Sequence, residues 1–188
     1  VAVPSQDMVL GIYYLTQERD GAPGQGKHFS SVNEALLAFE NKIINYHSKI
    51  WVRRTVDLPD GRKHTGEIET TLGRLVFNEI LPQDLGFVDR KTDDDYLQLE
   101  VDFMVGKKQL KKILEKVINT HGATRTAEVL DSIKAMGYRH STLAGMTVSV
   151  SDMTIPESKP EMIEQAEETV AKITRNYKRG LITDEERY

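Results

Sequence analysis

Cysteine is absent from the 188 residues of the chain. Its absence excludes disulfide frameworks, thiol nucleophiles, cysteine-based zinc sites and iron–sulfur clusters. A metal site would need histidine and carboxylate ligands, but no two histidines have the four-residue spacing of a helical metalloprotease pair. The sequence therefore predicts no metal or other cofactor bound by this chain. The five histidines are His28, His47, His64, His121 and His140.

Long hydrophobic runs are also absent, because no apolar stretch approaches the ~20 residues needed to cross a bilayer. No secretory signal is recognisable at the start of the sequence, so we expect a cytoplasmic protein without a membrane partner. Charged residues make up 29% of the chain and hydrophobic residues 39%, which is typical of a soluble globular domain. The net charge of −4 argues against a uniformly basic nucleic-acid coat and leaves only local basic patches.

Charge is unevenly distributed along the second half of the chain. Residues 84–102 contain seven acidic and two basic side chains, whereas residues 103–125 contain six basic and one acidic. A helix that begins near Lys107 would bury one apolar face, so its lysines would project from the opposite face and from the first turn. This apolar face is predicted to contain Leu110, Ile113, Leu114, Val117 and Ile118.

Capping signals and apolar periodicity predict two helices near the start of the chain. The first would be capped by Ser5 and would end near Thr16. The second would begin at Ser31, with a capping box completed by Glu34, and its apolar face would reach Ile43.

Glycines mark the expected ends of two later helices. Gly122 would end the helix that begins near Lys107, and Gly137 would end a helix over residues 124–136. The reason is that glycine readily adopts the positive φ found just after a helix.

Strands are predicted mainly in the middle of the chain. β-Branched and aromatic residues indicate a strand over residues 50–56, which would return over 63–68 after a turn rich in Pro, Asp and Gly. A further strand is predicted over 70–77, and a surface loop and strand over 84–102. The alternation over 146–151 predicts a half-buried strand. Together these elements predict an α+β fold of mixed helices and short antiparallel strands.

The C-terminal segment is predicted to form a protruding coiled-coil helix arm. Apolar residues over 160–179 recur at steps of three and four, as in a coiled-coil seam, and Gly180 would end this helix. A capping box over 183–186 predicts that a second helix, the other arm of the hairpin, begins there. Because the sequence stops soon after that signal and begins at Val1 rather than at Met, we expect a piece of a longer polypeptide.

Self-contained catalysis is not indicated. No Ser/His/Asp set, phosphate-binding glycine loop or acid–base carboxylate pair can be argued from spacing, and His47 and His140 are expected to be packed rather than catalytic. One functional feature remains. The pair Lys107–Lys108 follows the flexible Gly106 and is suited to phosphate oxygens, although two cations at a helix start oppose the macrodipole.

Seven stretches, in order along almost the whole chain, carry recognisable motifs. They are residues 3–16, 71–74, 77–79, 106–108, 149–153, 155–157 and 180–188. Together these stretches resemble the bacterial RNA polymerase β′ family. The resemblance implies a segment that lies shortly after the catalytic aspartate loop. Residues 1–155 would form the pore, or secondary-channel, domain, and residues 156–188 the first, truncated arm of the rim helical hairpin.

The resemblance also implies functional residues and partners. Gln6, Lys107 and Lys108 would face the channel near incoming nucleoside triphosphates or the 3′ end of backtracked RNA, and Asp131 and Tyr188 would belong to the neighbourhood of an alarmone pocket. The expected partners are the β, α, ω and sigma subunits, together with channel-binding transcription factors that dock on the rim.

Two features of the sequence limit what the resemblance implies. The motif that holds the catalytic magnesium, the bridge helix and the trigger loop are absent, so the parent enzyme would hold magnesium outside this chain and the isolated chain would be inactive. Leu143–Ala144 also replace a basic residue and Ser that many relatives carry before the position of Gly145. An alternative interpretation from the residues alone is a free-standing RNA-binding or coiled-coil adaptor module.

Overall fold

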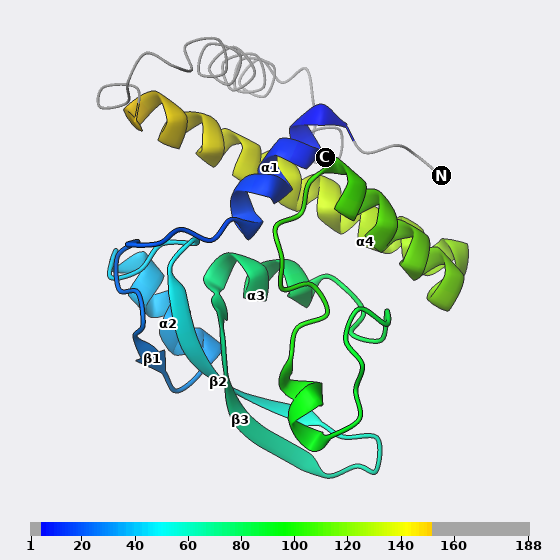
Figure 1. Cartoon of the computed structure of the whole chain (residues 1–188). Coiled ribbons are helices and arrows are strands. Elements are labelled where there is room, and N and C mark those ends of the chain that lie inside the picture. Colours follow the sequence, from blue (N-terminus) through cyan, green and yellow to red (C-terminus); the bar gives the residue numbers. More distant parts are fainter. Residues whose placement is uncertain (1–4, 152–188) are drawn as a thin grey trace.

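The computed structural model describes residues 5–151, and the predicted α+β class is confirmed (Figure 1). The expected coiled-coil arm and its capping box lie outside the described residues. In chain order the elements are α1 (Gln6–Thr16), β1 (His28–Phe29), α2 (Val32–Glu40), β2 (Lys49–Asp57), β3 (Lys63–Thr71), α3 (Leu72–Glu79), the 3-10 helix η1 (Asp93–Leu97) and α4 (Lys107–Ser151).

The predicted hydroxyl caps at Ser5 and Ser31 are present, but the predicted capping box is not completed, because the Glu34 carboxylate accepts from the hydroxyl of the preceding serine, residue 30. The hydroxyl oxygen of Ser5 accepts a hydrogen bond from the Met8 amide at 3.2 Å, and that of Ser31 accepts one from the Glu34 amide at 3.1 Å. Each bond satisfies one of the amides that a helix start leaves without an internal partner. Helix α2 is shorter than predicted, since it ends at Glu40 and leaves Ile43 exposed.

The predicted hairpin is confirmed, and a third strand extends it into a mixed sheet. Strands β2 and β3 pair antiparallel, from Lys49 opposite Thr71 to Asp57 opposite Lys63. The short strand β1 was not predicted, and it pairs parallel to β2 at the outer edge of the sheet. A strand of two residues has too short a pattern for sequence periodicity to reveal it.

The predicted strand over 70–77 is wrong, because β3 ends at Thr71 and the chain turns directly into α3. The Thr71 hydroxyl caps this helix by accepting from the Arg74 amide at 3.2 Å. Gly73 allows the helix to lie against the end of α1, where an added Cβ would come within 1.8 Å of the Leu15 carbonyl oxygen. The helix therefore depends on a cap and on a close approach between elements.

The predicted strand within 84–102 is also wrong. Leu97, Leu99 and Val101 alternate with polar residues in the sequence, as in a strand, and all three are buried, but no neighbouring strand pairs with them among the described residues. The Asn78 side chain takes the place of a strand neighbour. Its carbonyl oxygen accepts from the Val101 amide at 3.0 Å and its amide donates to the Val101 carbonyl at 2.7 Å.

Helix α4 begins at Lys107 as predicted and is interrupted at Gly122, where φ is 83° and ψ is −179°. In Figure 1 its two halves run back alongside each other from this point. Of the predicted apolar face, all members except the half-buried Ile118 are fully buried.

The second half of α4 does not end at Gly137, and the predicted strand over 146–151 is wrong, because the helix continues to Ser151. Gly137 instead permits a close helix crossing. A Cβ added to Gly11 of α1 would lie 1.9 Å from the Gly137 carbonyl oxygen. No proline interrupts residues 107–151, and extending an existing helix is far easier than starting one.

Two apolar clusters share the interior. One joins α1, both halves of α4 and the end of α3, and the other joins the sheet, α2 and the start of α3. Tyr46 packs against both clusters. In Figure 1, α3 therefore lies between an upper helical layer and a lower layer formed by the sheet and α2.

Candidate functional site

Lys107 and Lys108, here called the lysine pair, are the first two residues of α4, and both are exposed. Among residues 5–151, no carboxylate lies within ion-pair distance of either ammonium group. The free amides of a helix start add partial positive charge at the same place. Unneutralised cations beside such a terminus create a local positive potential that suits anions such as phosphate.

Residues 101–106, the segment before the lysine pair, are held in place mainly by side chains from other elements. Asn78 bonds both backbone groups of Val101, as described above. The Val105 amide donates to the Thr16 hydroxyl at 2.9 Å, which joins the segment to the end of α1. The Gly106 amide donates to the side-chain oxygen of Gln109 at 3.0 Å. The start of α4 is therefore fixed relative to α1 and α3.

Arg74 is the centre of this support, and its side chain is only 9% exposed. Its guanidinium donates to the Thr16 carbonyl at 3.0 Å, to Glu18 at 3.1 Å and to the Asp102 carbonyl at 3.4 Å. The Thr70 hydroxyl also holds the Asp102 carboxylate, at 2.8 Å. One buried cation thus ties α1, α3 and the segment before the lysine pair together.

Sequence reasoning did not assign a role to Arg74 or Asn78. Both belong to the motif stretches that carry the resemblance, 71–74 and 77–79, and both are buried polar residues within an otherwise apolar helix. A buried arginine or asparagine needs hydrogen-bond partners. A polar residue inside an apolar helical pattern was therefore the sequence signal that could have indicated a structural role for these two residues.

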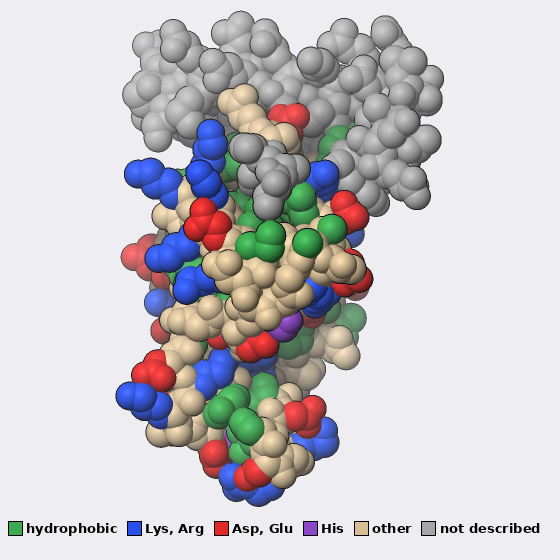
Figure 2. Space-filling view, turned by 90° about the vertical axis from the view of Figure 1, so that its right-hand side faces the viewer, with side chains coloured by type: hydrophobic (Ala, Val, Ile, Leu, Met, Phe, Trp, Pro, Cys, Tyr) green, Lys and Arg blue, Asp and Glu red, His purple; other side chains and the backbone are tan. Residues whose placement is uncertain are grey.

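A small hollow lies beside the lysine pair. It has a volume of about 290 Å³ and is lined by Phe87, Phe103, Lys108, Gln109 and Lys112. The two phenyl rings pack at 5.6 Å between centroids, and both belong to the edge of the helical core. Phe103 is half-buried. Figure 2 shows several Lys and Arg side chains gathered on the upper left of the described surface.

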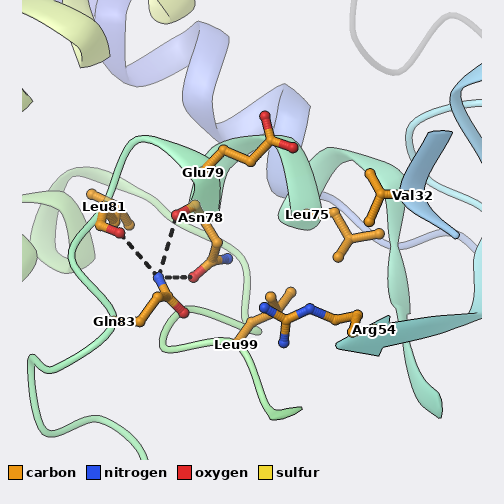
Figure 3. A pocket seen from close by; sticks show the side chains of 8 residues that line it. All are labelled: Val32, Arg54, Leu75, Asn78, Glu79, Leu81, Gln83 and Leu99. Atoms are coloured by element: carbon orange, nitrogen blue, oxygen red, sulfur yellow. Dashed lines mark hydrogen bonds between the residues drawn. The ribbon is translucent and has the colours of Figure 1, made fainter. Parts of the chain in front are cut away.

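A second hollow, of about 270 Å³, lies between α3 and β2 (Figure 3). The Gln83 amide nitrogen donates to Asn78 and to the Leu81 carbonyl, so this hollow is part of the same structural support. Burial lowers the pKa of Arg54, and the nearby Arg90 lowers it further. The residues that line this second hollow are Val32, Arg54, Leu75, Asn78, Glu79, Leu81, Gln83 and Leu99.

Two of the other predicted site residues lie on α1 and on the second half of α4. Gln6 is exposed at the first residue of α1. Asp131 is exposed on the second half of α4. Tyr188 lies outside the described residues.

The histidines expected to be packed are buried. The ring nitrogen Nε2 of His47 lies 2.6 Å from the Tyr14 carbonyl oxygen, and burial lowers the pKa of His47. Burial lowers the pKa of His140 to about 4, with a further contribution from Arg139. Within residues 5–151 no three His, Asp or Glu side chains are grouped so that they could hold a metal ion. None of the described helices is both long enough and apolar enough to cross a membrane.

Comparisons with known proteins agree with the resemblance. Residues 1–153 match the family described as RNA polymerase Rpb1, domain 3. The whole chain is similar to DNA-directed RNA polymerase subunit beta′ of Lachnoclostridium phytofermentans, at 61% identity, and of Acetivibrio thermocellus, at 56%. It covers 15% and 16% of these two relatives. The chain therefore belongs to the RNA polymerase Rpb1 domain 3 family and is a segment of a bacterial β′ subunit.

Proposed function

We propose that this chain lines the secondary channel of a bacterial RNA polymerase, through which nucleoside triphosphates reach the active centre and into which the 3′ end of backtracked RNA is extruded. The lysine pair would contact phosphate groups in this channel. The observation that carries the proposal is an exposed, unneutralised cation pair at a helix start whose position is fixed by Arg74, Asn78 and Thr16.

Physical chemistry supports a channel wall better than a catalytic centre. Lysines at a helix start weaken the helix by a few tenths of a kcal/mol, so their presence needs a compensating role. A narrow passage with unpaired cations focuses the field and raises the local concentration of anionic substrates. Gln6, exposed at the first residue of α1, would mark a second point of the wall.

The remaining parts of the proposal concern the assembled enzyme. Residues 1–155 would be the channel domain, and residues 156–188 the rim arm on which channel-binding factors dock. Asp131 and Tyr188 would border an alarmone pocket. The β, α, ω and sigma subunits would complete a cytoplasmic enzyme, whose catalytic magnesium would be held outside this chain. The chain itself would then position and admit substrates for nucleotidyl transfer.

The test replaces both lysines in the intact polymerase. Lys107→Glu with Lys108→Glu should raise the KM for nucleoside triphosphates or change the cleavage of backtracked RNA, because it places negative charge where phosphates pass. The matched control is Lys27→Glu with Lys42→Glu, which makes the same charge change at exposed lysines of the lower layer. A loss of thermal stability with normal transcription kinetics in the lysine-pair variant would contradict the proposal.

A further inference from the structure

We propose that α4 carries a track for single-stranded RNA that leads away from the lysine pair. The track consists of Lys108, Lys112 and Lys116, here called the lysine row, and of the phenyl rings of Phe87 and Phe103 beneath it. This inference rests on the proposed function and names extruded RNA, rather than a free nucleotide, as the ligand of this surface.

The lysine row follows one side of the helix. Residues four apart lie on the same face, and each step advances by about 6 Å along the axis. Lys108 and Lys112 line the hollow, and the Lys116 ammonium lies 5.0 Å from the centroid of the Phe87 ring. Cationic groups therefore recur at regular intervals above an aromatic floor.

The charges of the lysine row are not neutralised by the acidic segment next to it. Asp84 and Asp89, on either side of Phe87 in the sequence, are engaged elsewhere. Asp84 lies 2.6 Å from the His121 ring, and Asp89 lies 3.2 Å from the Lys91 ammonium. No ion pair of the described residues includes Lys112 or Lys116. The row therefore remains available for a ligand with repeated negative charges.

The size and lining of the hollow favour nucleic acid over a folded protein element. Small-molecule pockets have volumes of about 300–1,000 Å³, and the hollow, at about 290 Å³, is slightly smaller than that. A helix is about 10–12 Å across with its side chains, so a hollow of this volume cannot enclose one. Proteins that bind single strands without sequence preference combine a basic groove, which follows the phosphates, with aromatic rings that contact the bases. The lysine row and the two phenyl rings have this composition.

The experiment uses the intact polymerase with a photoreactive uridine in an unpaired RNA 3′ tail of increasing length. Short tails should crosslink near Lys107 and Lys108, and tails long enough to pass them should crosslink at Phe87, at Phe103 or within residues 112–116. Lys112→Gln with Lys116→Gln should lower the long-tail crosslink several-fold. In the same variant, the log of the long-tail crosslink yield should fall less steeply with the log of the salt concentration, by about 1.4 in slope. The reason is that each lost phosphate contact on a single strand removes about 0.7 from this slope.

Lys111 provides a matched control, since it is an exposed lysine next to Lys112 that does not line the hollow. Lys111→Gln should leave the crosslink unchanged, whereas Lys112→Gln should lower it. An equal loss in both variants would overturn the track, as would long-tail crosslinks that lie elsewhere than at Phe87, Phe103 or residues 112–116, or a protein segment found in the hollow. The proposed function is tested separately by the KM of the lysine-pair variants, so that the track can fail while the proposed function stands, and the two failures are distinguishable.

Discussion

The burial of His140 predicts a specific loss of stability in mild acid. The side chain is 1% exposed, it packs edge-on against the Tyr46 ring at 5.0 Å between centroids, and its Nδ1 atom has no hydrogen-bond partner. Charging this ring inside the fold is unfavourable, and the neighbouring Arg139 adds repulsion, so the pKa falls from 6.5 to about 4.

The direction and size of the effect follow from this pKa. Between pH 6.5 and 4 the unfolded chain binds a proton at His140 that the folded chain does not, so folding becomes less favourable as the pH falls. Over the whole interval the loss is about 3 kcal/mol, since each pKa unit corresponds to about 1.4 kcal/mol. Above pH 6.5 both states are neutral at this position, and the stabilising contribution is fully present.

The assay is urea unfolding of the 188-residue chain at a series of pH values, compared with His140→Phe, which keeps an aromatic ring against Tyr46 but cannot titrate. The difference in unfolding free energy between the two proteins should change by about 3 kcal/mol between pH 6.5 and pH 4. His28→Gln, at an exposed histidine, is the control and should leave most of the pH dependence in place. A difference that does not vary with pH would refute the reasoning.

Two further substitutions test the packing and the support of the lysine pair. Gly11→Ala should lower the unfolding free energy by about 2–3 kcal/mol, since the new methyl group would meet the Gly137 carbonyl oxygen at 1.9 Å. Gly106→Ala, whose methyl group would meet only the Gln109 side chain, should cost less, and similar losses would argue against a tight crossing. Arg74→Met should lower the unfolding free energy by about 2 kcal/mol, because it leaves Glu18 and Asp102 without their shared cation. Arg74→Lys should give an intermediate loss, and urea unfolding measures both variants. Unchanged stability in Arg74→Met would show that the network contributes little.

Local signals in the sequence determined the caps, the hairpin and the start of α4. Ser5 and Ser31 satisfy backbone amides three residues away, so the information lies within one turn of helix. The hairpin strands and the break at Gly122 are equally local. The lysine pair was identified for the same reason, since its position follows from the spacing of the apolar face behind it.

Only the tertiary structure decided the features that depend on distant residues. Glycine is common at helix ends, but Gly137 lies inside a helix and allows α1 to cross closely at Gly11, which is 126 positions earlier in the sequence. The segment before α4 has the alternation of a strand, but a side chain of α3 supplies its backbone partners. The aromatic hollow needs Phe87 and Phe103 to meet beside α4. Such contacts follow from the joint packing of several elements, and periodicity within one segment carries no information about them.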